Sequence, residues 1–308
     1  NTWRRYLGDS CILDNPATLI LDKVDIEENS SKRPFRYVLP KGIQRERFFS
    51  NQFADLFQNE SSLLIRKESF TPKCVQSVFR LGDNDFRRYK RLKMFVHAES
   101  PQDLPKGAVS VFLRFGKDFT QNYYEYEIPL RQSPSLGDSA VIQSQDSIWL
   151  AENEFDFPIQ LLTDLKNQRN LNGLPYNTLF EMADPDKPDN KVKVFGNPNV
   201  ALVRGIMIGI KNNTNQTISS YEIWANELRL TGLEDRAGYA ALARAEVTLA
   251  DLGNLSLAGS YTSIGFGSVD QRHPNRCDHV PGAGIFRASH MERGCVILRS
   301  VFQCGQGA

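Results

Sequence analysis

The sequence predicts a mainly β protein: a jelly-roll-like two-sheet β-sandwich with one short helix, followed by a β-hairpin of the membrane β-barrel type. Apolar and polar residues alternate with a period of two in many short segments, which indicates strands. Aromatic residues, which favour strands, make up 10% of the 308 residues. Many short strands with a single helix favour two packed sheets, and a jelly roll is the topology we expect.

The overall charge gives no sign of a nucleic-acid partner. The chain has 37 basic and 36 acidic residues, whereas nucleic-acid-binding proteins usually have a basic excess. No segment has the roughly 18 successive apolar residues of a transmembrane helix. The chain begins at Asn1 without Met, so we expect it to be an excised part of a longer protein.

Strand-like segments are spread over the first 232 residues. Residues 17–21 and 35–39 are short candidates. The clearest alternation lies in residues 92–97, 107–115, 123–130, 206–210 and 221–230. This alternation places five residues inside the sandwich: Val96, Phe112, Tyr126, Ile208 and Trp224. A regular strand would put Trp224 on the same face as Asn226, Leu228 and Leu230.

Residues 157–169 are predicted to form an amphipathic helix that packs on the sandwich. Its apolar face has helical spacing and consists of Leu161, Leu162 and Leu165. Asp156 fits the N-cap and Pro158 fits the first turn.

Changes of pattern divide the chain into four parts. We expect a β-sandwich module over residues 1–232, a polar hinge over 233–238, a barrel-type hairpin over 239–272 and an aberrant tail over 273–308. The tail has neither a helical nor a strand period, so we interpret it as frameshifted or disordered.

The hairpin has two rows of opposite character. One row of its first strand is wholly apolar and is expected to face lipid: Ala241, Ala243, Ala245, Val247 and Leu249. Arg244, Glu246 and Thr248 form the opposite row. Each arm is close to the 9–11 residues that a tilted membrane strand needs. Alanine also favours helix, but the unbroken alternation and the turn at 251–254 favour strands.

Signatures of catalysis are absent from the sequence. It contains no nucleophile elbow, zinc-protease helix motif, phosphate-binding loop or dinucleotide fingerprint. Glu125 and Glu127 lie two apart, as paired glycosidase carboxylates could, but exposed acids that improve solubility are the simpler interpretation. His97 is expected on the surface or on a sheet face. We therefore predict no catalytic residue.

Three groups of residues resemble ligand sites without matching one. Asp184, Asp186 and Asp189 have the rhythm of a calcium loop, but two prolines interrupt it. The His and Cys residues of the tail match no zinc spacing. Neither a metal nor a cofactor is therefore predicted. Four aromatic residues could instead form a sugar-binding platform, although a core position is the simpler interpretation: Tyr123, Tyr124, Trp149 and Trp224.

Two cysteines lie in the sandwich module. Cys11 and Cys74 could form a disulfide, while two buried free thiols are the plainer alternative.

Several long strings resemble the SprA (Sov) family of gliding-motility proteins, the outer-membrane translocons of the type IX secretion system of Bacteroidetes. They include RRYKRLKMFVHAES at 87–100, NEFDFPIQLLTDLKNQRN at 153–170, GNPNVALVRGIMIGIKN at 196–212 and GNLSLAGSYTSIGFGSVDQ at 253–271. The resemblance covers roughly residues 1–272, in order, and stops at the tail.

The resemblance implies a non-enzymatic segment of a very large barrel at the bacterial outer membrane and cell surface. Its implied partners are secreted substrate proteins and other components of the secretion system. The alternative interpretation, from another class, is a carbohydrate-binding β-sandwich module.

Overall fold

The computed structural model describes residues 2–8, 18–45, 47–48, 56–134, 144–233, 240–249, 253–263, 284–285 and 294–304. The chain divides into two compact units, residues 1–233 and 234–308. Each unit is described by itself.

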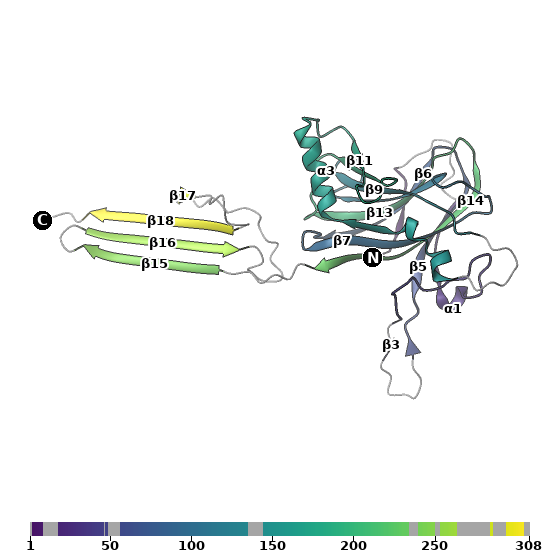
Figure 1. The fold of residues 1–308 in the computed structure, drawn as a ribbon, viewed down its shortest axis with the longest axis horizontal. Helices are drawn as coiled ribbons and strands as arrows, with labels where there is room; N and C mark the ends of the chain where they lie inside the picture. The colour runs from purple at the N-terminus through teal and green to yellow at the C-terminus, as the bar shows by residue number, and fades with distance from the viewer. Residues whose placement is uncertain are drawn as a thin grey trace. The chain divides into compact units, whose positions relative to one another are not determined.

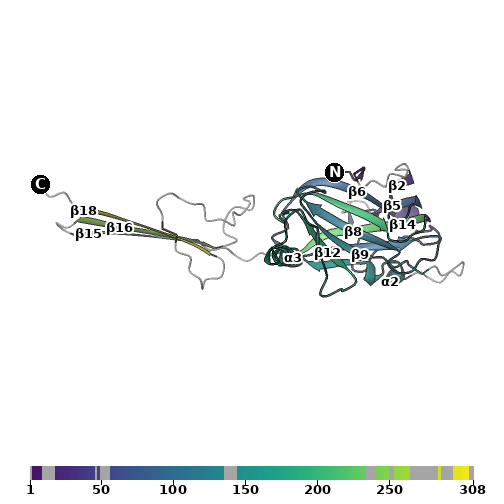
Figure 2. The same cartoon turned by 90° about the horizontal axis from the view of Figure 1, so that it is seen from above.

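The first unit contains two large antiparallel sheets (Figures 1 and 2). The seven-stranded sheet has the order β1 (Arg4–Tyr6), β6 (Val75–Asn84), β13 (Val203–Asn212), β8 (Val109–Gly116), β9 (Tyr123–Pro129), β12 (Lys191–Phe195) and β11 (Phe180–Ala183). The five-stranded sheet has the order β10 (Phe155–Pro158), β7 (Tyr89–Glu99), β14 (Ile218–Leu233), β5 (Ser61–Phe70) and β2 (Leu19–Asp25). The chain changes sheet from β5 to β6, from β6 to β7 and again from β7 to β8.

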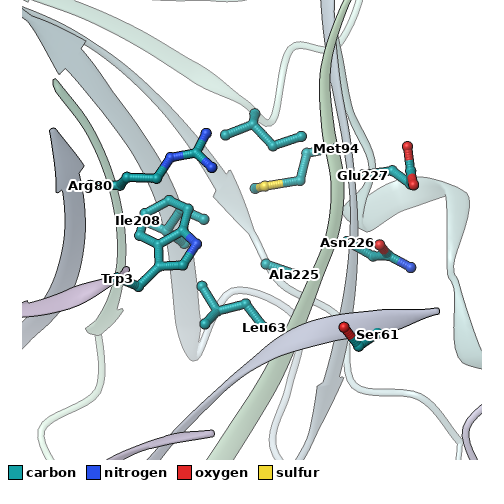
Figure 3. Close-up of a pocket in the computed structure, with 10 residues that line it drawn as sticks. Trp3, Ser61, Leu63, Arg80, Met94, Ile208, Ala225, Asn226 and Glu227 are labelled. Carbon is teal, nitrogen blue, oxygen red and sulfur yellow. The ribbon is translucent and has the colours of Figure 1, made fainter. Parts of the chain in front are cut away.

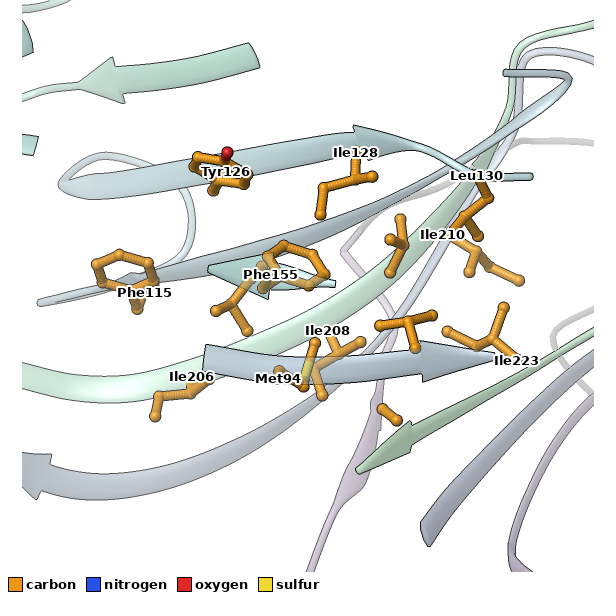
Figure 4. Packing of buried hydrophobic residues seen from close by; sticks show 14 of the residues in the cluster. Met94, Phe115, Tyr126, Ile128, Leu130, Phe155, Ile206, Ile208, Ile210 and Ile223 are labelled. Carbon is orange, nitrogen blue, oxygen red and sulfur yellow. The ribbon is translucent and has the colours of Figure 1, made fainter. Parts of the chain in front are cut away.

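The main core lies between the two sheets. Strand alternation directs every second side chain into it, as Figure 4 shows for the isoleucines of β13 and for Met94 of β7. Tyr126 of β9 stacks on Phe157 of β10 with ring centroids 4.2 Å apart, so an aromatic pair joins the sheets. Two packed antiparallel sheets confirm the predicted mainly β, two-sheet architecture.

Three of the five predicted core residues lie in this inter-sheet core: Val96, Tyr126 and Ile208. The placement of the other two was wrong. Phe112 and Trp224 are buried, at 3% and 0% exposure, but on the outer faces of their sheets. Phe112 packs with Phe119 and Met207 on the seven-stranded sheet. Trp224 packs on the five-stranded sheet beneath the chain that covers it.

A β-bulge explains the error at Trp224. The register of β14 against β7 shifts between Asn226 and Arg229, and Glu227 has a positive φ of 52°. One extra residue on β14 reverses which face the following side chains occupy. Leu228 and Leu230 therefore pack against the inter-sheet core, whereas Trp224 faces outward.

The helix α3 (Gln160–Leu171) buries Leu161, Leu162 and Leu165, as predicted. Its predicted start was wrong. Asp156 and Pro158 belong to β10, and Ile159 is the N-cap. Phe155 and Phe157 are fully buried and pair with β7, so burial of the two rings favours a strand over a helix cap at these positions.

Shorter elements lie around the sheets. They are α1 (Ile26–Asn29), α2 (Gln145–Ile148), the 3₁₀ turn η2 (Ala151–Asn153) and the two-residue strands β3 (Arg47–Phe48) and β4 (Leu56–Phe57). The predicted strand at 35–39 does not form. Its alternate residues Phe35 and Tyr37 are still buried, but they pack on the outer face of the five-stranded sheet. They belong to the irregular residues 30–40, which we call the covering segment.

The second unit contains an antiparallel sheet of order β15 (Ala240–Leu249), β16 (Gly253–Ser263), β18 (Gly294–Cys304) and β17 (Gly284–Ile285). The first two strands form the predicted hairpin, so the strand interpretation of 240–249 is confirmed over the helix alternative. Of the expected hinge, Leu233 belongs to β14 and residues 234–238 lie outside the described residues.

Residues 294–304 correct the expectation of a tail without regular structure, because β18 pairs with β16 along its whole length. The segment CVILRSVF at 295–302 is rich in β-branched and aromatic residues, which suits a strand. Its origin in another reading frame remains a prediction.

Candidate functional site

The hairpin β15–β16 brings apolar residues opposite one another. Ala241 pairs with Tyr261, Ala245 with Leu257 and Val247 with Leu255. Paired residues of antiparallel strands occupy the same face of a sheet. The row predicted to face lipid therefore continues across both strands, as Ala241, Ala243, Ala245, Val247 and Leu249 on β15 opposite Tyr261, Gly259, Leu257, Leu255 and Gly253 on β16. We call these residues the apolar row.

The opposite face of the hairpin is mainly polar. Arg244 donates a hydrogen bond to Glu246, and Glu246 and Thr248 pair across the strands with Ser256 and Asn254. Leu242 interrupts this face and is 84% exposed. The two strands have 10 and 11 residues, which suits a tilted membrane strand of about 9–11 residues. None of the helices that the structure describes is long and apolar enough to cross a membrane.

Glu125 and Glu127 are buried rather than exposed, which corrects the expectation of solubilising acids. The ammonium group of Lys193 lies 2.8 Å from Glu125 Oε1 and also binds Glu127, while Arg114 Nε binds Glu125 at 2.8 Å. Burial acts to lower the pKa of Lys193, but the charges and hydrogen bonds of the two carboxylates raise this pKa to about 12. Paired with one lysine, these acids act as a structural ion cluster on the seven-stranded sheet.

The aspartate loop organises a turn. Asp184 is buried and accepts a hydrogen bond from the Tyr126 hydroxyl, and its Oδ1 accepts one from the backbone of Asp186 at 2.9 Å. Asp189 binds Lys106 at 2.8 Å. Within the described ranges, no group of three or more His, Cys, Asp or Glu side chains is arranged to hold a metal ion.

The aromatic platform proposed for sugars is not formed. Tyr124, Trp149 and Trp224 are buried, at 2%, 6% and 0% exposure. Trp149 donates its indole N–H to the Val38 carbonyl at 2.8 Å. Because a platform must present open ring faces, these three residues offer no surface to a sugar. Tyr123, the fourth, is half-buried, with the Arg114 guanidinium 4.4 Å from its ring centre and the Phe195 ring stacked at 5.8 Å. The carbohydrate-binding alternative therefore loses the platform on which it rested.

We call the outer face of the five-stranded sheet, which the covering segment packs on, the covered face. It carries a buried ionic cluster. Lys32, from the covering segment, binds Glu99 Oε1 at 3.0 Å and also binds Glu222. Arg66 Nε lies 2.6 Å from Glu222 Oε2. Lys32 also lies 4.6 Å from the centre of the Trp224 ring, so the covering segment is held by both ionic and cation–π contacts.

His97 belongs to this face and is completely buried, so of its two expected positions the sheet face is confirmed and the surface is wrong. Its Nδ1 lies 3.0 Å from the Ile148 carbonyl, and its ring lies 4.1 Å from that of Trp224. Its Nε2 lies 3.9 Å from Glu99 Oε2. Burial acts to raise the pKa of Glu99, but interaction with His97 and the charge of Lys32 lower it to about 2.

The first unit also contains a pocket of about 200 Å³ at one end of the space between its sheets (Figure 3). We call it the mouth pocket. Trp3, Leu63, Met94, Ile208, Ala225 and Leu228 supply its apolar lining, and Ser61, Arg80, Asn226 and Glu227 its polar lining. It lies beside the bulge of β14, because Asn226 and Glu227 belong to both.

Comparison with known families relates these features to a class of protein. The model of the SprA N-terminal family (SprA_N), described as motility related/secretion protein, matches residues 1–281. The chain belongs to the SprA_N family. The match covers the whole sandwich unit and the hairpin β15–β16. A comparison with curated proteins found no match to the chain.

Membership of the SprA_N family makes the chain a motility- and secretion-related protein and implies a place in the cell envelope. The sequence pattern of this SprA_N member predicted its apolar row but not its covered face or its mouth pocket. His97 and Glu99 lie on the row of β7 that alternation assigns to the outer face, so alternation gave no sign that they are buried. The available signal was the large aromatic residues Phe95 and Trp224, which share their rows with these two residues and with Glu222, because such residues are usually buried.

Proposed function

We propose that this SprA_N chain is a non-enzymatic segment of an outer-membrane protein-secretion translocon linked to gliding motility. In this proposal the sandwich is exposed at the cell surface and the hairpin contributes strands to the wall of a large β-barrel. The partners are secreted substrate proteins and other components of the secretion system.

The apolar row carries the proposal. In a barrel wall, the residues of each strand face lipid and the lumen in turn, so polarity must alternate over about 10 residues. The register of β15 against β16 keeps the apolar residues of both strands on one face and the Arg244–Glu246 pair on the other. In a family of secretion proteins, this pattern supports a strand pair that lines a protein-conducting wall.

The disulfide bond of Cys74 supports a position outside the cytosol. Cys74 is disulfide-bonded, so the alternative of a free thiol is wrong for this residue. Cys11 lies outside the described residues. Disulfides persist in oxidising compartments such as the bacterial periplasm and the cell surface.

The proposal includes a jelly roll for the module at the cell surface. Eight strands support it: β5, β14, β7 and β10 adjoin in one sheet, and β6, β13, β8 and β9 adjoin in the other. Successive strands from β5 to β8 alternate between the sheets, as the paired Greek keys of a jelly roll require. The remaining strands lie at the edges of the two sheets: β2 in the five-stranded sheet, and β1, β12 and β11 in the seven-stranded sheet.

A pair of neighbouring arginine substitutions tests the membrane role. In the full-length protein expressed in cells, Val247→Arg places a charge on the apolar row, and Thr248→Arg places the same charge on the other face. At the bilayer midplane a lipid-facing arginine costs about 2–4 kcal/mol, whereas lumenal changes are tolerated. We expect Val247→Arg to reduce both the amount of protein in the outer membrane and the secretion of substrates.

Thr248→Arg is the matched control and should leave both quantities close to those of the unsubstituted protein. If the two variants assemble and secrete equally well, the apolar row does not face lipid and the barrel-wall role is wrong.

A further inference from the structure

The mouth pocket contains a charged residue where the strand pattern requires an apolar one. On β6, Val78 is buried in the core between the sheets. Arg80 lies two residues further along and therefore faces the same way. It pairs with Ile206 of β13, which belongs to that core. The guanidinium group thus lies at the end of the inter-sheet space, inside the pocket (Figure 3).

No carboxylate of the described residues neutralises Arg80. Its only described side-chain interaction is with the ring of Trp3, whose centre lies 5.3 Å from the guanidinium carbon. Glu227 lines the same pocket, but its carboxylate lies 3.9 Å from Arg229 Nη1. A partly buried cation without an acidic partner favours an anionic ligand, and guanidinium binds carboxylate with two parallel hydrogen bonds.

The apolar part of the pocket lining indicates which kind of group the ligand carries beside its anion. Trp3, Met94, Ile208 and Leu63 form an apolar floor beside Arg80. Pockets that enclose a drug-sized ligand measure about 300–1,000 Å³, and this one measures about 200 Å³. Its size therefore suits one apolar side chain rather than a long acyl chain or a folded surface.

We propose that the mouth pocket is a peptide-binding site. One apolar side chain of a partner peptide inserts beside Trp3, and the adjacent carboxylate binds Arg80. That carboxylate belongs either to the C-terminus of the peptide or to an acidic residue next to the apolar one. The site is independent of the membrane role of the hairpin.

Three N-acetylated pentapeptide probes test the site on the 308-residue chain by calorimetric titration. The first has four glycines and a C-terminal phenylalanine with a free carboxylate, the second is its C-terminal amide, and the third is an amide with aspartate before the phenylalanine. A charge-assisted bond predicts that the amide binds about tenfold more weakly than at least one acidic probe. The preferred acidic probe identifies the source of the carboxylate.

Variants separate the site from general charge effects. Arg80→Gln should abolish the preference for the acidic probes while weak binding of phenylalanine persists, and Trp3→Leu should weaken all three probes. Arg88→Gln, at an exposed position of the turn before β7, is the matched control and should keep the preference. Near-ultraviolet circular dichroism confirms that each variant is folded.

Two results would overturn the proposal. One is an absence of binding, or equal binding of acid and amide, by the folded unsubstituted chain. The other is a preference for the acidic probes that survives in Arg80→Gln.

Discussion

One charged side chain, Lys32, links the covering segment to the five-stranded sheet. Lys32 contacts two carboxylates, Glu99 and Glu222, and both carboxylates are largely buried. A buried ion pair loses hydration energy when it forms, so its net contribution is small, but removal of one partner leaves an uncompensated buried charge. Packing of the covering segment on the sheet is therefore sensitive to the loss of any one of these charged side chains.

The first prediction concerns the acid stability of Glu99. Its pKa is about 2 in the folded chain and 4.5 is its ordinary value. Because the folded pKa is the lower one, the stabilisation is present above about pH 4.5 and is lost as the pH falls towards 2. The shift corresponds to roughly 3 kcal/mol. Denaturant titrations at several pH values should show this loss, and Glu99→Gln should reduce it.

Glu181→Gln serves as the control, because Glu181 pairs with Lys191 at the surface, where both side chains are about half exposed. An acid dependence of Glu99→Gln equal to that of the unsubstituted chain would show that Glu99 is not stabilised as an anion.

At the level of strands, the bulge in β14 is a feature that the sequence pattern did not predict. Periodicity identified the buried rows of β7, β9 and β13, because regular strands keep one face towards the core. It could not reveal that one extra residue at Glu227 exchanges the faces of Trp224 and Leu228. Bulges depend on pairing with a distant strand, here β7, and that pairing leaves no local pattern.

The second prediction tests the backbone of this bulge. Glu227 has a φ of 52°, which asparagine tolerates and which a β-branched residue strongly disfavours. We expect Glu227→Val to lower the free energy of unfolding by about 1–3 kcal/mol relative to Glu227→Asn. Thermal unfolding of the two variants compares them directly, and equal stabilities would contradict the left-handed conformation.

The helix α3 gives a third prediction, from two leucines of one element. Leu165 is completely buried, whereas Leu171 is 85% exposed. Leu165→Ala should cost about 2–5 kcal/mol because it leaves a cavity beneath the helix. Leu171→Ala should change the free energy of unfolding by less than about 0.5 kcal/mol. Comparable losses in denaturant unfolding would mean that the helix packs through another face.

The same helix shows why boundaries were harder to predict than elements. The leucine spacing was a local signal and correctly indicated the buried face. The pairing of Phe155 with Met94 of β7 decided where the helix could begin. Such long-range pairing overrides the local preference of Asp156 and Pro158 for a helix start.

For the whole chain, alternation identified both a sandwich and a strand hairpin, and long sequence strings indicated the family that the comparison shows. The mouth pocket was not predictable, since Trp3, Arg80 and Met94 come from three distant segments that only the packed sheets bring together. The hairpin remains the part on which the proposed function depends.

The most direct test measures the surroundings of successive residues on β15 in the full-length protein. Nitroxide labels at positions 241 to 246, one at a time, report collisions with oxygen, which concentrates in lipid, and with a water-soluble nickel complex. We predict an alternation of period two, with labels at Ala241, Ala243 and Ala245 exposed to lipid and labels at Leu242, Arg244 and Glu246 exposed to water. Equal accessibility at all six positions, or the reverse alternation, would contradict a strand in the membrane wall with the apolar row facing lipid.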